Sequence, residues 1–140
     1  SLHDALPIYF VTRLENRSKI KSFLEPLGFS TTYSSDAFSN HVHPVGSARV
    51  DFMYVDTITG DEIFSAIQKR IIFKDRLVPV VAPHHLIAMK LFSAGNNPGR
   101  KLKDLADIRE IVLRTDLDKE FLKKSFKKYG LEQYYDDVIG

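Results

Sequence analysis

The chain has 140 residues, 44% of them hydrophobic, so it can bury one sizeable core but is too short for two ordinary domains. Twenty Lys and Arg residues against eighteen Asp and Glu leave a formal net charge of +2, which does not by itself indicate nucleic-acid binding. The sequence contains no cysteine, which excludes disulfides, zinc-thiolate sites and a cysteine nucleophile.

The first third of the chain predicts strands around one helix. Residues 8–12 form a short apolar run typical of a buried strand. Residues 13–27 change to helical spacing, and Gly28 is placed to end that helix. From residue 29 the apolar period is close to two, which predicts antiparallel strands separated by turns such as Gly46-Ser47. We expect these strands at 29–33, 42–45 and 49–55.

The middle of the chain predicts a turn, a helix and a strand pair. Residues 57–61 have turn-like composition, and residues 62–70 place Ile63, Phe64 and Ile67 on one face of a short amphipathic helix. The next segments predict paired strands at 71–74 and 77–81.

The rest of the chain has helical spacing. Pro83 suits the first turn of a helix over 84–94, and Asp118 is a candidate N-cap. Gly130 is placed to end the helix that Asp118 begins. The remaining helices are expected at 101–114, 118–129 and 131–139.

These elements predict an α+β fold in a single, partial domain over residues 1–140. Its sheet-containing part covers 8–82, where a mixed β-sheet is flanked by helices, and a helical tail covers 83–140. Apolar stretches such as 77–82 are much shorter than a membrane span, and the N-terminal residues lack the pattern of an export signal. We therefore expect a soluble cytoplasmic protein with no membrane partner.

Asp51 is the first candidate for chemistry. Residues 49–55 alternate as a strand, with Val50, Phe52 and Tyr54 on one side and Asp51 on the other. A carboxylate in the middle of a strand is costly to bury unless a metal, a cation or several donors meet it. The alternative is an ion pair of Asp51 with Arg49 on a solvated sheet face.

Two helical segments carry further charged candidates. Lys90 lies on the apolar side of its helix, where it can extend its ammonium to water or to an anion. In the next helix, Lys103 and Asp107 are spaced as an i, i+4 pair beside Asp104. A network of ion pairs in an otherwise ordinary α+β domain would explain this pattern of charged residues without any function.

In combination, these segments resemble nucleotidyltransferase-fold proteins of the AbiEii toxin type. The resemblance rests on Leu27-Gly28-Phe29, Val50-Asp51, the lysine-bearing helix at 83–91, and Lys103-Asp104-Leu105-Ala106-Asp107, in that order. It covers roughly residues 8–139.

The resemblance implies a function for the intact protein. It would use Mg²⁺ to transfer a nucleoside monophosphate from a nucleoside triphosphate to an acceptor such as RNA or protein, with a cognate antitoxin as a further partner. By resemblance, Asp51 is a catalytic metal ligand, Lys90 and Lys103 contact nucleotide or phosphate, and Asp104 and Asp107 are signature residues that support the site.

The chain departs from the family at its first motif. The family has Gly-Ser followed about ten residues later by an Asp-x-Asp or Asp-x-Glu pair, expected on the strand at 8–12. The sequence lacks this arrangement, because Gly46-Ser47 lies in a predicted hairpin and no paired carboxylate follows it at that distance. Residues 1–8 resemble a translated sequencing adaptor, which would mean that the chain is N-terminally truncated. One carboxylate cannot build a two-metal site, so we expect the chain as given to be inactive. The alternative is a non-catalytic regulatory or antitoxin-like binding module of the same fold.

Two further patterns have simple explanations. His41 and His43 alternate along a predicted strand and could begin a metal site, but no third ligand is matched to them. The lysines of residues 119–128 are interleaved with aromatic residues, a pattern typical of a helix with one solvated face and one buried face. The alternative is a surface that contacts RNA or a nucleotide.

Overall fold

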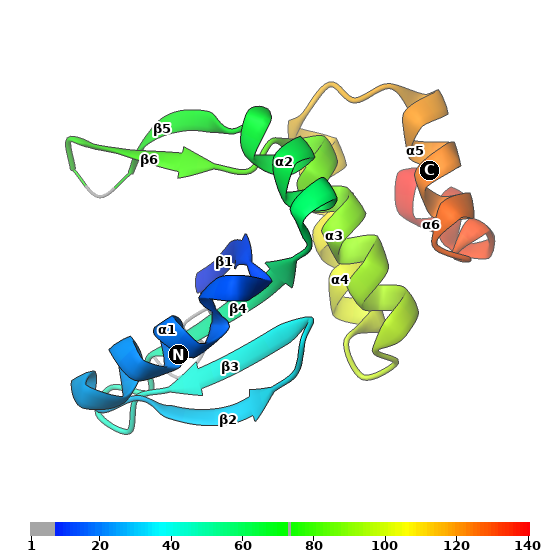
Figure 1. Ribbon diagram of the computed structural model, residues 1–140. Helices are drawn as coiled ribbons and strands as arrows, with labels where there is room; N and C mark the ends of the chain where they lie inside the picture. Colours follow the sequence, from blue (N-terminus) through cyan, green and yellow to red (C-terminus); the bar gives the residue numbers. More distant parts are fainter. Residues whose placement is uncertain (1–7, 73) are drawn as a thin grey trace. The chain divides into compact units, whose positions relative to one another are not determined.

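The computed structural model describes residues 8–72 and 74–140, and its elements confirm the α+β class (Figure 1). The chain divides into two compact units, residues 1–65 and 66–140, here called the sheet unit and the helical unit. Each unit is described by itself. Within the described ranges, no helix is long and apolar enough to cross a membrane.

The sheet unit contains a mixed four-stranded sheet in the order β1-β4-β3-β2. β1 runs parallel to β4, whereas β3 is antiparallel to both β4 and β2. The predicted strand at 8–12 is therefore the hydrogen-bonded neighbour of the strand that carries Asp51. The strand bounds are Ile8–Arg13 (β1), Ser30–Ser34 (β2), Phe38–Val42 (β3) and Arg49–Val55 (β4).

The prediction of a strand at 42–45 was wrong, because β3 begins at Phe38 and ends at Val42. The Ser35 hydroxyl accepts hydrogen bonds from the amides of Ala37 and Phe38 in the turn that starts β3. The buried residues of this strand are Ser39 and His41, both polar, so the sequence shows no apolar alternation there.

One helix, α1 (Arg17–Leu24), follows β1, with short 3-10 turns before and after it. Gly28 ends this segment in the left-handed region, at φ 94°, as predicted. A Cβ atom at Gly28 would lie 2.7 Å from His43 Nε2, so the position requires glycine for space as well as for its dihedral angle.

The helix predicted at 62–70 is displaced: α2 covers Thr57–Ser65, including the residues expected to form a turn. Asp56 explains the earlier start, because its Oδ1 accepts a 2.7 Å hydrogen bond from the Thr59 amide in the first turn of α2. This hydrogen bond lowers the pKa of the exposed Asp56 carboxyl.

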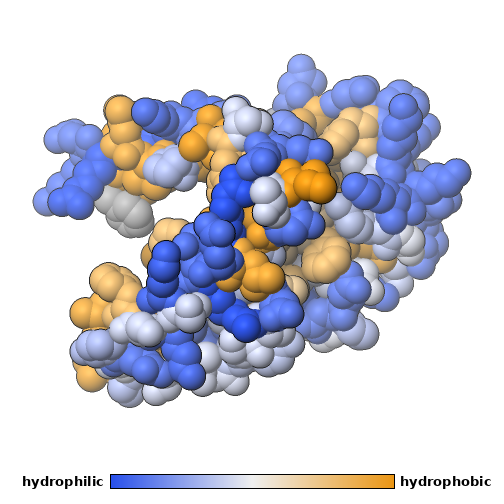
Figure 2. All heavy atoms as spheres, viewed as in Figure 1, coloured by the Kyte–Doolittle hydropathy of each residue, from blue (hydrophilic) through white to orange (hydrophobic). Residues whose placement is uncertain are grey.

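The predicted strand pair is a two-stranded antiparallel sheet, β5 (Gln68–Ile72) with β6 (Arg76–Val80). Both strands begin before the predicted bounds, and residue 73 lies outside the described residues. Figure 2 shows hydrophobic side chains on the surface of this hairpin, where Ile71 is 69% exposed and Leu77 63% exposed.

Four helices and one cluster of buried side chains form the rest of the helical unit. Pro83 begins the first helix and Asp118 caps the third, accepting a hydrogen bond from the Glu120 amide, as expected. The helices are α3 (Pro83–Asn96), α4 (Lys101–Arg114), α5 (Lys119–Lys128) and α6 (Tyr135–Ile139). The largest fully buried core side chains are Ile87, Leu91, Ile108, Leu122 and Phe126.

Candidate functional site

Asp51 lies in the middle of β4 with its side chain only 4% exposed. The ion pair with Arg49 that the alternative predicted is present, but the side chain of Asp51 is buried and not on a solvated sheet face. Its Oδ1 accepts hydrogen bonds from Asn40 Nδ2 at 2.7 Å and from Arg49 Nε at 3.2 Å. Its Oδ2 is buried and has no hydrogen-bond partner among the described residues. One oxygen of this buried carboxylate is therefore paired with Arg49 and Asn40, and the other has no hydrogen bond among the described residues.

The sheet register defines the neighbours of Asp51. Tyr9 of β1 lies opposite Asp51 on one side, and Asn40 of β3 lies opposite it on the other. Within residues 8–72 and 74–140, no group of three or more His, Cys, Asp or Glu side chains could hold a metal ion. Asp51 fits Mg²⁺ as one hard oxygen ligand, and the described residues do not complete a two-metal site around it.

The helical unit brings together the charged residues of the two predicted helical motifs. Lys90 Nζ of α3 lies 2.6 Å from Asp107 Oδ2 and 3.4 Å from Asp104 Oδ1, both on α4. The other oxygen of Asp104 accepts a 2.7 Å hydrogen bond from Ser93 and lies 3.7 Å from Arg100 Nε. We call these residues the Lys90 cluster.

The Lys90 cluster differs from the expected i, i+4 pair of Lys103 with Asp107. In this part of the structure Asp107 pairs across the helices with Lys90, and Lys103 is exposed. Lys90 is 14% exposed and engaged by carboxylates. A contact of Lys90 or Lys103 with phosphate stays a prediction.

A row of polar side chains on the other face of the sheet was missed by the sequence analysis. Thr31 Oγ1 lies 3.0 Å from His41 Nδ1, and His41 Nε2 lies 2.8 Å from Ser39 Oγ. Ser39 Oγ in turn lies 2.6 Å from the Tyr54 hydroxyl. We call these four side chains the polar row. The alternation of β4 places Tyr54 on the face opposite Asp51.

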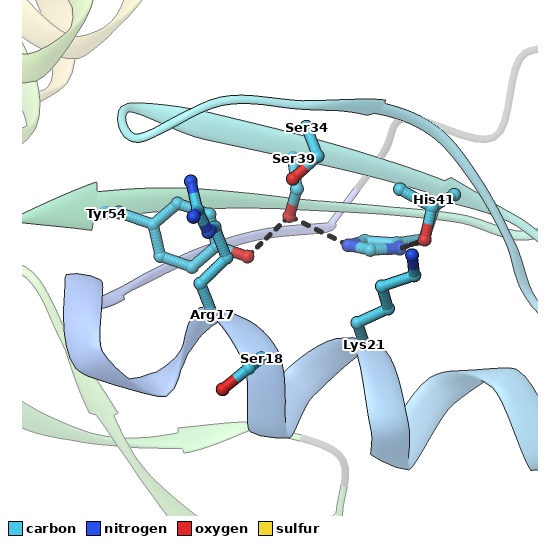
Figure 3. Close-up of a pocket in the computed structure, with 8 residues that line it drawn as sticks. Arg17, Ser18, Lys21, Ser34, Ser39, His41 and Tyr54 are labelled. Atoms are coloured by element: carbon cyan, nitrogen blue, oxygen red, sulfur yellow. Dashed lines mark hydrogen bonds between the residues drawn. The ribbon is translucent and has the colours of Figure 1, made fainter.

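The polar row forms one wall of a cavity of about 350 Å³. Helix α1 contributes Arg17, Ser18 and Lys21, and Ser34 of β2 completes the lining. Figure 3 shows Ser39 between Tyr54 and His41, with the side chains of Arg17 and Lys21 extending from α1 toward them. Among the residues that the structure describes, no acidic side chain lines the cavity.

His41 is the titratable group at this wall. It is 1% exposed, and burial lowers the pKa of its imidazole, with a smaller lowering from the positive charge of Lys21. The charge of Asp51 acts in the opposite direction. His41 is therefore neutral at pH 7, when one ring nitrogen donates a hydrogen bond and the other accepts one.

The other histidines of the described residues do not join His41 in a ligand set. His43 lies beyond β3, where its Nε2 is 3.0 Å from the Leu27 carbonyl oxygen and its Nδ1 accepts from the Val45 amide. The rings of His84 and His85 lie against one another at the start of α3, with centroids 4.1 Å apart. The pair of His41 and His43 therefore serves to hold backbone and side chains of the sheet unit.

The chain was compared with protein-family models and with curated proteins, and neither comparison returns a match.

Proposed function

We propose that this protein is nucleotidyltransferase-like and that its intact form uses Mg²⁺ to transfer a nucleoside monophosphate from a nucleoside triphosphate to an acceptor. Acceptors in this proposal are RNA or protein, a cognate antitoxin is a further partner, and the location is the cytoplasm. Asp51 is the proposed catalytic metal ligand. The chain as given has no Gly-Ser followed about ten residues later by an Asp-x-Asp pair, and it is proposed to be inactive by itself.

The observation that carries the proposal is the environment of Asp51. Arg49 pairs with Oδ1 of Asp51, but the buried Oδ2 has no hydrogen-bond partner among the described residues, and leaving it without one is costly unless a ligand meets it. In addition, β1 is the parallel neighbour of β4, with Tyr9 opposite Asp51. Because alternate residues of a strand share a face, a carboxylate on β1 at the alternation of Tyr9 would lie on the same face as Asp51, as a two-metal site requires.

The Lys90 cluster is in keeping with the resemblance and equally with an ion-pair network that has no function. The lysine of the first helical motif and the two aspartates of the second are separated by more than ten residues, yet they meet in ion pairs. Asp104 and Asp107 thus hold the Lys90 ammonium in place, in keeping with their proposed supporting role. Lys90 and Lys103 are the proposed contacts to nucleotide phosphates.

The proposed reaction is an in-line displacement. An acceptor oxygen forms a bond to the α-phosphorus of the nucleoside triphosphate, the bond to pyrophosphate breaks, and the acceptor proton is released. Mg²⁺, when bound, neutralises the phosphate charges, and Asp51 would hold it through the unpartnered oxygen.

The test uses the product of the complete gene. Radiolabelled nucleoside triphosphates are supplied with Mg²⁺ and with RNA and protein acceptors, and label transfer is measured. We expect Asp51→Asn to reduce transfer by at least about a hundredfold, because it removes a metal-binding charge. Asp75→Asn, which removes an exposed carboxylate of the β5–β6 turn, is the control. Unchanged transfer in Asp51→Asn would refute the assignment.

The alternative is a non-catalytic regulatory or antitoxin-like module. The observation that favours it is that the described residues form no group of three or more His, Cys, Asp or Glu side chains that could hold a metal ion. Calorimetry of the same gene product with Mg²⁺ and nucleoside triphosphates separates the two proposals. Micromolar binding that is lost in Asp51→Asn supports the transferase, and no binding supports the module.

A further inference from the structure

We propose that the cavity between α1 and the polar row binds the phosphate group of a phosphorylated small molecule. This site lies within the sheet unit, on the face opposite Asp51, and does not depend on the proposed transferase activity.

The charge of the lining suits a phosphate. Arg17 and Lys21 are one helical turn apart, so their cationic groups reach the same cavity from α1. Their acidic partners, Asp36 and Glu25, do not line the cavity and have side chains that are 83% and 56% exposed. Water screens those ion pairs, so both cations can reorient toward an anion at small cost.

The polar row leaves a donor for the ligand. Its four side chains carry one hydrogen-bonding proton each when His41 is neutral, and three hydrogen bonds join them. Four protons and three bonds leave one proton. When His41 carries its proton on Nδ1, it donates to Thr31, and the remaining proton is on the Thr31 hydroxyl. When the proton is on Nε2, His41 donates to Ser39 and Ser39 donates to Tyr54, so the remaining proton is on the Tyr54 hydroxyl. Thr31 and Tyr54 both line the cavity, so an oxyanion placed there can accept this proton.

The size of the cavity favours a phosphate that is attached to a larger molecule. About 350 Å³ lies within the range of small-molecule sites and exceeds the volume of a lone phosphate ion. The hydroxyls of Ser18 and Ser34, also in the lining, can bind the polar groups of a sugar or polyol.

The test measures binding of inorganic phosphate and of ribose 5-phosphate to the 140-residue chain by calorimetry. We expect the ester to bind, and Arg17→Gln and Lys21→Gln each to weaken binding about tenfold or more, because each removes a charge-assisted hydrogen bond. Lys19→Gln is the matched control, since it removes the same charge from an exposed position of α1 outside the cavity.

A second variant distinguishes the cavity from general surface charge. Ser34→Tyr keeps both cations and fills the space with a ring, so it should abolish binding while the far-ultraviolet circular dichroism stays unchanged. Tighter binding of the ester than of phosphate identifies a phosphorylated small molecule, and equal binding identifies free phosphate in the same site. The proposal is overturned if neither ligand binds, or if Lys19→Gln weakens binding as much as Arg17→Gln and Lys21→Gln.

Discussion

The two buried carboxylates in the described residues differ in how their oxygens are satisfied. Both oxygens of Asp104 have partners, in Lys90 on one side and in Ser93 and Arg100 on the other. Asp51 has partners for one oxygen only. A fully partnered buried carboxylate is expected of a structural residue, whereas a half-partnered one is expected of a residue that meets a ligand.

His41 predicts a pH dependence of stability. Its folded-state pKa lies below the ordinary value of 6.5, so the unfolded chain binds the proton more readily than the folded protein. Stability from neutral His41 is therefore present above about pH 6.5 and falls as the pH decreases through 6.5 toward the folded-state pKa. Denaturant unfolding at pH 7.5, 6.5 and 5.5 measures this fall.

The variant His41→Gln removes the titrating group, so its stability should fall less between pH 7.5 and 5.5 than that of the unchanged protein. His84→Gln, which removes a histidine at the start of α3, serves as the control. An equal fall in His41→Gln and the unchanged protein would show that another group is responsible.

At the scale of elements, the turn between α1 and β2 depends on the backbone conformation of Gly28. We expect Gly28→Ala to destabilise the protein by about 1–2 kcal/mol from the left-handed backbone alone. A further loss should follow because the new Cβ would meet His43 Nε2, which contacts the Leu27 carbonyl.

Gly46→Ala provides the matched comparison for this prediction. Gly46 also has a positive φ, 76°, but a Cβ there would meet nothing within 4 Å. Chemical denaturation should therefore show a larger loss of free energy of unfolding for Gly28→Ala than for Gly46→Ala. Equal losses would mean that His43 moves aside without cost.

At the scale of the whole molecule, the division into two units predicts where the effect of a mutation appears. Asp104→Ala removes the buried partner of Lys90 and should destabilise the helical unit by about 3 kcal/mol. Asp107→Ala removes a carboxylate that is 37% exposed, and we expect a loss of at most about 1 kcal/mol.

Hydrogen exchange measured by mass spectrometry locates this change. In Asp104→Ala the amides of α3 and α4 should lose protection first, because Asp104 joins these two helices. An equal loss of protection throughout β2 and β3 would instead indicate that the two units unfold together.

Much of the fold could be inferred from the order of the residues. The α+β class, α4, the N-cap Asp118 and the turn at Gly28 follow from apolar period, capping chemistry and glycine, all of which act between near neighbours in the chain. The strand at 49–55 and the unusual position of Asp51 within it were visible for the same reason.

Other features depend on contacts between residues far apart in the chain. The start of β3 could not be inferred, because Ser39 and His41 face inward and are satisfied by Tyr54 and Thr31 on other strands. The partner of Asp107 could not be inferred either, because Lys90 reaches it from a different helix. The cavity beside α1 and the unpartnered oxygen of Asp51 are likewise products of tertiary structure, since burial and hydrogen-bond satisfaction exist only once the strands and helices have packed.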